Sequence, residues 1–169
     1  MKILFLDIDG VLNSFDNDYA MSELYKLDNT NKIRDEFGIL FDERCVRWLR
    51  WIIEKTECKI VLSSTWRCVG LSKIQLMWEV RDLPGEVISI TPTSVSSEII
   101  NLYAATNNEA DRGYEIQEWL DTNEWSKYCI VDDDNDMLSS QNFVRTEKQI
   151  GLNYKTANSI VAILNAQIM

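Results

Sequence analysis

The stretch that decides the fold is KILFLDIDGVLN, residues 2–13, in which an apolar run ends in two aspartates and a glycine. Residues 2–6 have the length and continuous apolar character of a strand that is buried on both faces of a parallel sheet. Gly10 permits the backbone to bend after that strand, so Asp7 and Asp9 can face one point beyond its end. The alternative is an ordinary acidic loop, since Asp and Gly are common in turns.

Outward from this stretch, the chain alternates between the patterns of strands and helices. Further strands are predicted at 59–64, 86–90, 128–131 and 142–146. Helices are predicted over 43–55 with Asp42 as N-cap, from Leu71 through Trp78, over 112–121, and across a last stretch that carries Ile160, Ile163 and Leu164. Strands separated by helices predict an α/β fold, a three-layer Rossmann-like sandwich around a central, mostly parallel sheet. We expect a single domain over 1–169, with 14–41 and 91–110 as small cap or loop inserts.

Three of the predicted strands end in polar residues. The first ends in Asp7, the second in Ser63 and the fourth in Asp132. In parallel sheets of this kind, binding sites form beyond the carboxyl ends of the strands. We therefore expect these three side chains to meet at one edge of the sheet.

An acidic cluster follows the fourth predicted strand in IVDDDNDM, residues 130–137. Carboxylates that share a small volume repel one another at neutral pH, so they either keep protons or gather around a cation. A hard divalent ion with oxygen ligands, Mg²⁺ for preference, satisfies that charge. A calcium-loop reading is weak, because the loop has no glycine at its sixth position. The acidic residues concerned are Asp132, Asp133, Asp134 and Asp136.

Two further segments carry groups that suit a phosphate. In SSTWR, residues 63–67, the hydroxyls of Ser63 and Ser64 can donate to phosphate oxygens, and Arg67 can add a bidentate grip. Arg112 stands at the start of the helix predicted over 112–121, where a cation could neutralise both Asp7 and a phosphoryl group. Taken alone, the serines are ordinary turn residues and an arginine at a helix start is solvated surface.

Composition excludes several classes of function. The chain has no histidine, which removes serine–histidine and cysteine–histidine nucleophilic systems and ordinary catalytic zinc sites. Its net charge is −10, so an extended nucleic-acid groove is not expected. The four cysteines have no metal-like spacing and are interpreted as structural. The apolar runs are too short for a membrane span or a secretory signal, so we expect a cytoplasmic protein without membrane contact.

Taken together, these motifs resemble those of the haloacid dehalogenase-like (HAD) superfamily of phosphohydrolases. DIDGV is similar to its first motif, IVLSS to its second, Arg112 to its third and VDDDND to its fourth. The run of DIDGVLN, SSTWR, RGYEIQEWL and VDDD, followed by VRT and GL, is similar to the small HAD domains associated with RNA-repair proteins. The resemblance covers nearly the whole chain.

The resemblance implies a Mg²⁺-dependent phosphatase. Asp7 would attack phosphorus to give an aspartyl phosphate, and Asp9 would protonate the leaving oxygen and then activate water. Ser63 and Arg112 would hold the phosphoryl oxygens, while Ser64, Arg67 and Gly10 would contact the substrate. The metal would be held by Asp7, the backbone carbonyl of Asp9 and Asp132, with Asp133 or Asp136 in support.

Two departures from the superfamily pattern leave alternatives open. The third-motif cation is usually lysine, so Lys73 or Lys127 could fill the role given to Arg112. The fourth motif offers more aspartates than a metal needs, and the sequence does not choose among Asp133, Asp134 and Asp136.

The short inserts indicate an open site that admits a small phosphorylated substrate or a nucleic-acid end. Tyr19, Tyr25 and Trp66 are candidates for stacking on a base or sugar, although buried aromatic residues are the commoner case. A binding module of weak activity that acts through a partner, or a phosphotransferase, would use the same residues. The sequence leaves the oligomeric state open.

Overall fold

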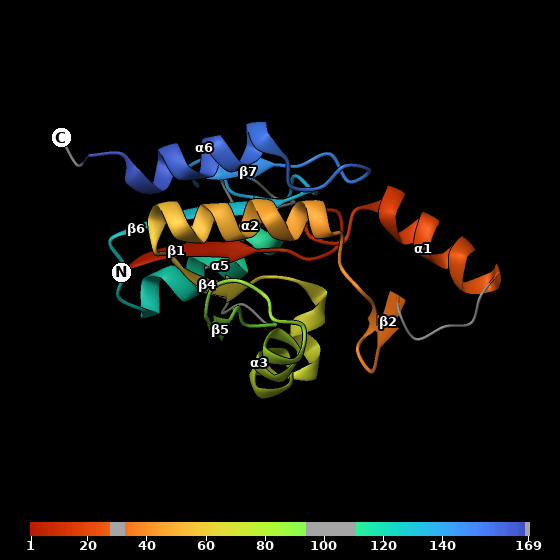
Figure 1. Ribbon diagram of the computed structural model, residues 1–169. Helices are drawn as coiled ribbons and strands as arrows, with labels where there is room; N and C mark the ends of the chain where they lie inside the picture. Colours follow the sequence, from red (N-terminus) through yellow and green to blue (C-terminus); the bar gives the residue numbers. More distant parts are fainter. Residues whose placement is uncertain (28–32, 94–110, 168–169) are drawn as a thin grey trace.

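A five-stranded sheet forms the centre of the computed structural model, which describes residues 1–27, 33–93 and 111–167 (Figure 1). The strands lie in the order β5-β4-β1-β6-β7. All four neighbouring pairs are parallel, which confirms the predicted α/β fold with a parallel central sheet. The strands are β1 (Lys2–Leu6), β4 (Lys59–Leu62), β5 (Val87–Ile90), β6 (Lys127–Asp132) and β7 (Phe143–Arg145).

The central strand β1 brings the polar strand ends together. Leu6, its last residue, is in register with Leu62 on β4 and Val131 on β6. The next residue on each strand is therefore Asp7, Ser63 or Asp132. The ladder continues past the strand end, because the Asp7 N–H donates to the Val131 carbonyl at 3.1 Å and the Ser63 N–H donates to the Leu6 carbonyl at 2.9 Å.

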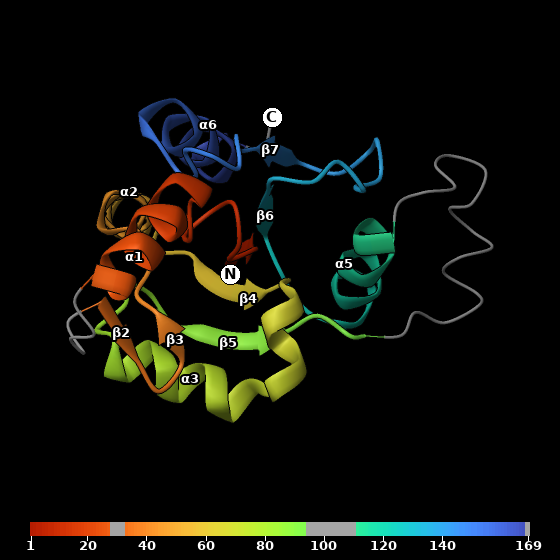
Figure 2. The same ribbon diagram turned by 90° about the vertical axis from the view of Figure 1, so that its right-hand side faces the viewer.

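Helices cover both faces of the sheet, which explains why β1 is apolar at successive positions. Leu4 and Leu6 belong to the cluster that contains α2 (Glu43–Thr56) and α6 (Tyr154–Asn165), whereas Ile3 and Phe5 pack with α5 (Asp111–Thr122). Figure 2 shows α2 and α6 on one side of the strands and α5 on the other. A fourth helix, α3 (Leu71–Val80), contributes Ile74, Met77 and Trp78 to the first cluster.

The predicted start of α2 is confirmed. The Asp42 carboxylate accepts a hydrogen bond from the Arg44 N–H at 2.9 Å, as an N-cap does, and a second from the Ser14 hydroxyl at 2.7 Å. The second bond ties the helix start to the segment that follows β1. Because a parallel crossover begins at the carboxyl end of a strand, Asp42 lies near the edge where the polar strand ends meet.

Two elements differ from the sequence prediction. The strand predicted over 59–64 ends at Leu62, because Ser64 accepts the Trp66 N–H and caps a short 3₁₀ helix, η2 (Thr65–Val69). Residues 14–41, expected as an insert, contain an unpredicted helix, α1 (Phe15–Leu27), followed by strands β2 (Arg34–Asp35) and β3 (Gly38–Ile39). Tyr19 and Leu24 of α1 are exposed, so this helix has no apolar stripe that the sequence could reveal.

The insert at 14–41 extends past the carboxyl end of the sheet, where α1 projects away from the strands (Figure 1). Its base is fixed to the segment after β7, since the Phe15 N–H donates to the Lys148 carbonyl at 2.9 Å. Of the second predicted insert, at 91–110, residues 94–110 lie outside the described residues.

Within the described residues, no helix combines the length and the apolar composition that crossing a membrane requires.

Candidate active site

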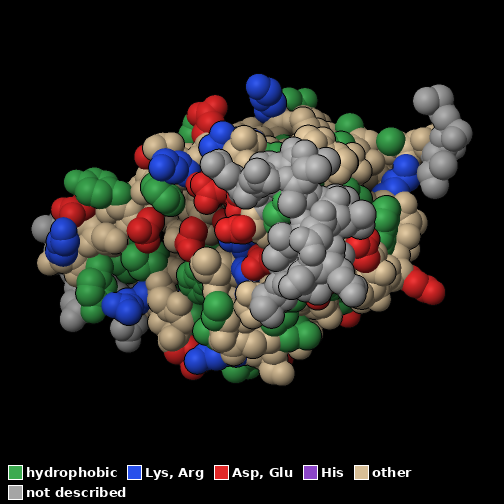
Figure 3. Space-filling view, turned by 180° about the vertical axis from the view of Figure 1, so that it is seen from behind, with side chains coloured by type: hydrophobic (Ala, Val, Ile, Leu, Met, Phe, Trp, Pro, Cys, Tyr) green, Lys and Arg blue, Asp and Glu red, His purple; other side chains and the backbone are tan. Residues whose placement is uncertain are grey.

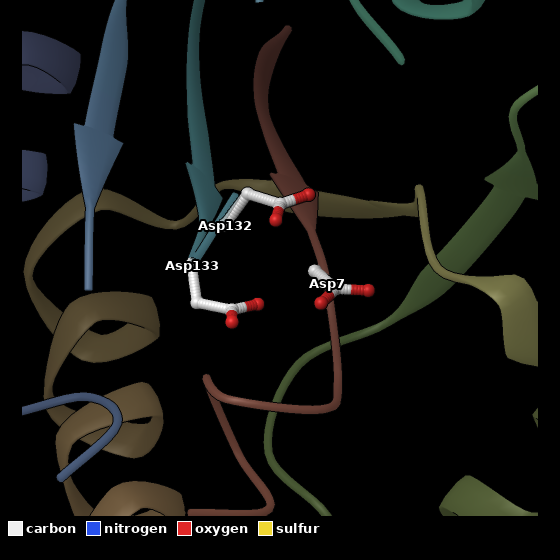
Figure 4. Close-up of side chains that lie close together, drawn as sticks. All are labelled: Asp7, Asp132 and Asp133. Carbon is white, nitrogen blue, oxygen red and sulfur yellow. The ribbon is translucent and has the colours of Figure 1, made fainter. Parts of the chain in front are cut away.

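Three carboxyl groups meet at the carboxyl edge of the sheet. Each of Asp7, Asp132 and Asp133 offers one oxygen, and the three oxygens lie within 4.8 Å of one another. Asp7 follows β1, Asp132 ends β6 and Asp133 is the next residue, and Figure 4 shows their carboxyl groups around one space. Asp7 and Asp132 are buried and Asp133 is half-buried. The predicted convergence of Asp7 and Asp132 is therefore present.

Burial makes this cluster hard to ionise. Burial raises the pKa of Asp7 to about 6, against the opposing effects of a hydrogen bond with Ser64 and the charge of Arg112. Burial, reinforced by the charge of Asp7, raises the pKa of Asp132 to about 8. The pKa of Asp133 is also raised, chiefly by burial. Without a cation, the cluster therefore holds at least one proton at neutral pH.

The cluster fits a hard divalent cation. The Oδ2 atom of Asp132 is buried and has no hydrogen-bond partner among the described residues, and the nearest side-chain cation, Nε of Arg112, lies 3.8 Å away. An unpaired buried carboxylate oxygen is costly, and a metal ion relieves that cost. Because all the donors are oxygens, Mg²⁺ suits the cluster better than zinc or copper does.

Gly10 lets the two acidic loops approach. Its φ is +74°, and a Cβ atom built there would lie 2.5 Å from Cγ of Asp133. Thr146, just after β7, secures the contact because its hydroxyl donates to the Gly10 carbonyl at 2.9 Å and its N–H donates to the Asp132 carbonyl at 2.9 Å. The sequence predicted the bend at Gly10, whereas the role of Thr146 is visible only in the structure.

Asp9 lies beside the cluster and not within it. Its Oδ1 accepts a hydrogen bond from Nδ2 of Asn13 at 3.2 Å, and its Oδ2 accepts one from Nε1 of Trp66 at 2.9 Å. Its charge is close enough to contribute to the raised pKa of Asp7. The Asp9 side chain is half-buried, so part of it is open to solvent at this edge of the sheet.

The two serines after β4 have different partners. The Ser64 side chain forms a hydrogen bond with Asp7 and caps η2. The Ser63 hydroxyl is buried and has no partner among the described residues. A buried hydroxyl without a partner is unfavourable, so a phosphate oxygen at this edge would satisfy it.

Of the three candidates for the third-motif cation, Arg112 is the one that the structure brings to the acidic cluster, and the charges of Arg145 and Lys148 also act on Asp133. Its Nη1 donates to the Ser63 carbonyl and its Nε lies 3.8 Å from Oδ2 of Asp132. Lys127, one sequence alternative, is the first residue of β6 and so lies at the opposite end of that strand from Asp132. Lys73, the other, is exposed on α3.

Three further acidic or basic residues that the sequence singled out, Asp134, Asp136 and Arg67, also lie outside the three-carboxylate group. Asp136 accepts the backbone N–H of Arg112 at 3.3 Å and so fixes the start of α5, while Asp134 is exposed. Arg67 is buried, with its Nη2 2.5 Å from Oε1 of Glu115 and its Nη1 2.8 Å from the Ser64 carbonyl. In this structure Arg67 therefore ties η2 to α5.

Sequence reasoning gave no role to Asn13, Thr146 and Glu115, and it considered Trp66 only for stacking on a base or sugar. Asn13 and Trp66 hold Asp9, Thr146 holds Gly10, and Glu115 pairs with Arg67. All four stand within the motifs that carry the family resemblance, and that position was the only signal for their supporting roles.

Acidic and basic side chains lie side by side on one face of the molecule. Figure 3 shows Asp and Glu side chains gathered there with Lys and Arg among them.

Comparison with known proteins gives one match. The model of the family described as "HAD domain in Swiss Army Knife RNA repair proteins" matches residues 3–157. No curated protein and no solved structure matches the chain.

Proposed function

Because the chain belongs to the family of HAD domains in Swiss Army Knife RNA repair proteins, we propose that it is a Mg²⁺-dependent phosphatase with Asp7 as nucleophile. The family suggests phosphohydrolase activity. The observation that carries the proposal is the approach of the carboxyl groups of Asp7, Asp132 and Asp133 to within 4.8 Å at the edge of the sheet, with Arg112 beside them.

In the first step, an oxygen of Asp7 forms a bond to phosphorus while the bond from phosphorus to the leaving oxygen breaks. The electron pair of the broken bond stays on the leaving oxygen, which takes the proton carried by Asp9. This divides one difficult displacement into two easier ones through an aspartyl phosphate. The position of Asp9 next to Asp7 supports its role as the acid.

In the second step, a water oxygen bonds to phosphorus as the bond to Asp7 breaks. The water proton passes to Asp9, and the electron pair returns to the Asp7 carboxylate. The products are the alcohol and inorganic phosphate, and both aspartates recover their starting states. One carboxyl group acts as acid and then as base, as microscopic reversibility requires.

The nucleophile and the ester are both anionic, so the reaction needs positive charge at the site. Bound Mg²⁺ would supply charge neutralisation between them. Asp7, Asp132 and Asp133 are the side chains that would hold it, and the backbone carbonyl of Asp9 is a further proposed ligand. Arg112 and the hydroxyl of Ser63, which has no hydrogen-bond partner in the described part of the chain, are suited to the phosphoryl oxygens.

For the substrate, we propose a nucleotide or the phosphorylated end of a polynucleotide. A pocket of about 560 Å³ between the β2–β3 hairpin, α2 and the end of α3 supports this choice. Arg34, Arg47 and Arg50 line it, and among the described residues Arg34 and Arg47 form no ion pair. In a chain of net charge −10, such a group of arginines suits a few phosphates of a strand.

The pocket is joined to the proposed acid by aromatic contacts. Phe41 lines the pocket, and its ring centroid lies 5.7 Å from that of Trp66. The indole N–H of Trp66 in turn donates a hydrogen bond to the Asp9 carboxylate. This link between the lining of the arginine pocket and the residue that holds Asp9 supports a substrate whose phosphorylated end lies at Asp7 and whose next phosphates contact the arginines.

The proposal is tested by phosphate release from an aryl phosphate and from phosphorylated oligonucleotides, with and without Mg²⁺. We expect activity that requires Mg²⁺ and is lost in Asp7→Asn, which keeps the shape of the side chain and removes its nucleophilic charge. Tight binding of phosphorylated ligands without turnover would instead indicate a binding module. Transfer of the phosphoryl group to an added alcohol would indicate a phosphotransferase.

A further inference from the structure

We infer that Trp66 is the positioning residue of Asp9, and that its indole N–H fixes the orientation in which the Asp9 carboxyl group exchanges its proton. The inference rests on the proposed phosphatase function, in which Asp9 is the acid and base. It adds a residue that orients the proposed acid, whereas the sequence suggested at most that Trp66 stacks on a base or sugar.

The first support is the contact between the two side chains. Nε1 of Trp66 lies 2.9 Å from Oδ2 of Asp9, and the two residues are 57 positions apart in the chain. The other oxygen, Oδ1, accepts from Asn13 at 3.2 Å. With one donor on each oxygen, the carboxyl plane cannot rotate freely about its terminal torsion, which is otherwise broad.

The second support is that Trp66 is itself held. Its backbone N–H donates to the capping Ser64 hydroxyl at 3.4 Å, so the residue is fixed at the first turn of η2. Its ring meets Phe41 edge to face at a centroid distance of 5.7 Å and an interplanar angle of 67°. Phe41 is only 6% exposed, so the partner ring is anchored in the core.

The third support is a continuous set of contacts from the insert to Asp9. Arg81 forms two hydrogen bonds of 2.8 Å with the Asp35 carboxylate on β2. Its guanidinium carbon lies 4.5 Å from the centroid of the Phe41 ring, which contacts Trp66. The hairpin of the insert and the proposed acid therefore share one rigid base.

The chemistry of indole fits a positioning role and not a proton-transfer role. The indole N–H is a donor only, so Trp66 cannot take up or return the proton. What it can do is hold Oδ2 of Asp9 while Oδ1, which also accepts from Asn13, exchanges the proton with the leaving group or with water. Acid–base catalysis contributes about 10²- to 10⁴-fold to a rate, and it depends on this geometry.

Kinetics with two substrates separate positioning from a structural effect. An alkyl phosphate has a poor leaving group and needs the acid, whereas 4-nitrophenyl phosphate has a good one and needs it little. We expect Trp66→Phe to lower kcat for the alkyl ester about 10- to 100-fold and for the aryl ester at most about threefold. KM should remain within about twofold for both, and Asp9→Asn should show the same asymmetry in stronger form.

Trp125→Phe is the matched control. Trp125 also donates its indole N–H, to the Leu120 carbonyl at 3.0 Å, but it follows the C-terminal end of α5, whereas Arg112 lies in the first turn of that helix. The same substitution there should change neither substrate's kcat. A fall in that variant equal to that of Trp66→Phe would overturn the inference.

A second readout needs neither Mg²⁺ nor substrate. The indole N–H resonance of Trp66, assigned by its loss in Trp66→Phe, should shift in Asp9→Ala, whereas that of Trp125 should not. If Trp66→Phe lowered kcat equally for both esters, or if the Trp66 resonance did not shift in Asp9→Ala, Trp66 would not position Asp9. Wild-type protein inactive on both esters would contradict the proposed function itself, which is a distinct result.

Discussion

A Cβ atom on Gly10 would lie 2.5 Å from Cγ of Asp133, so the loops after β1 and β6 meet only because residue 10 has no side chain. The contact brings the first and the fourth motif together across more than 120 residues of chain. Asp133 supplies the third oxygen of the acidic cluster, so Gly10 decides whether that cluster can form.

Gly10→Ala should therefore impair both folding and metal binding. The positive φ and the clash together should lower the free energy of unfolding by about 2–4 kcal/mol. Mg²⁺ affinity, measured by calorimetry, should fall as Asp133 is displaced. Gly70→Ala is the control, because Gly70 has a φ of +89° but a Cβ atom there meets nothing within 4 Å. That variant should lose stability from backbone strain alone and keep its Mg²⁺ affinity.

Mg²⁺ should stabilise the wild-type protein through Asp7, Asp132 and Asp133. At a concentration of 100 times Kd, binding adds about 2.7 kcal/mol to the free energy of unfolding, which thermal denaturation detects as a rise in Tm. The rise should be lost in Asp132→Asn and Asp133→Asn. It should persist in Asp136→Asn, since Asp136 bonds the backbone of Arg112 and is not part of the cluster. Loss of the rise in Asp136→Asn alone would contradict this ligand set.

The metal-free protein should lose stability as the pH rises from about 4 to about 8. The pKa values of Asp7 and Asp132 are about 6 and about 8, above the ordinary value of 3.8. In that range the folded state binds more protons than the unfolded state, so raising the pH favours unfolding. Below it, stability should fall again, because Asp35 and Asp42 have lowered pKa values and lose their paired charge as they take up protons.

Denaturant unfolding at a series of pH values measures this dependence. Asp132→Asn should flatten the decline between pH 4 and pH 8, because the amide carries no charge to bury. Saturating Mg²⁺ should flatten it as well, since the cation favours the ionised carboxylates. A metal-free wild-type protein that grows more stable between pH 6 and pH 8 would contradict the raised pKa values.

Thr146→Val should weaken the site without touching any proposed ligand. The change removes the 2.9 Å hydrogen bond to the Gly10 carbonyl and leaves that carbonyl without its side-chain partner. The expected cost is about 1–3 kcal/mol of unfolding free energy, together with weaker Mg²⁺ binding. Thr146→Ser, which keeps the hydroxyl, should recover most of both. If Thr146→Val and Thr146→Ser changed the unfolding free energy and the Mg²⁺ affinity equally, the loss of the hydrogen bond would not be the cause of these changes.

The arginine pocket should matter for strands and not for single nucleotides. Changing Arg47 and Arg50 to glutamine should lower kcat/KM for a phosphorylated oligonucleotide and leave that for a mononucleotide unchanged. If each arginine contacts one phosphate, the slope of log(kcat/KM) against log salt should fall by about 0.7 per arginine. Lys55→Gln removes a charge from the last turn of the same helix and should have no such effect. Equal losses on both substrates would contradict contact with the strand.

The sequence was a good guide wherever local patterns and burial agree. The apolar run at 2–6 identifies a strand that is buried on both faces, since every position is then apolar. The apolar stripe of Cys45, Leu49 and Ile52 identifies a helix that is buried on one side, since only that side is then apolar. The insert was different. Its helix α1 buries no apolar stripe, so its residues show no helical periodicity of apolar positions in the sequence.

The same distinction applies to the site. Asp7, Ser63 and Asp132 could be grouped from the sequence, because parallel strands put their carboxyl ends on one edge. The sequence did not show which neighbouring side chains join these three residues. Asp133 turns into the cluster while Asp136 accepts the backbone N–H of Arg112, although both stand in the same acidic run.

By itself, the sequence determined the five strands of the central sheet, the helices that cover it and the edge at which the acidic residues lie, because alternation and strand polarity are local properties. The tertiary structure decided which side chains hold one another there. The bond from Trp66 to Asp9 joins residues 57 positions apart and that from Thr146 to Gly10 joins residues 136 apart. Such contacts depend on how loops from different strands pack together, and no periodicity along the chain encodes that.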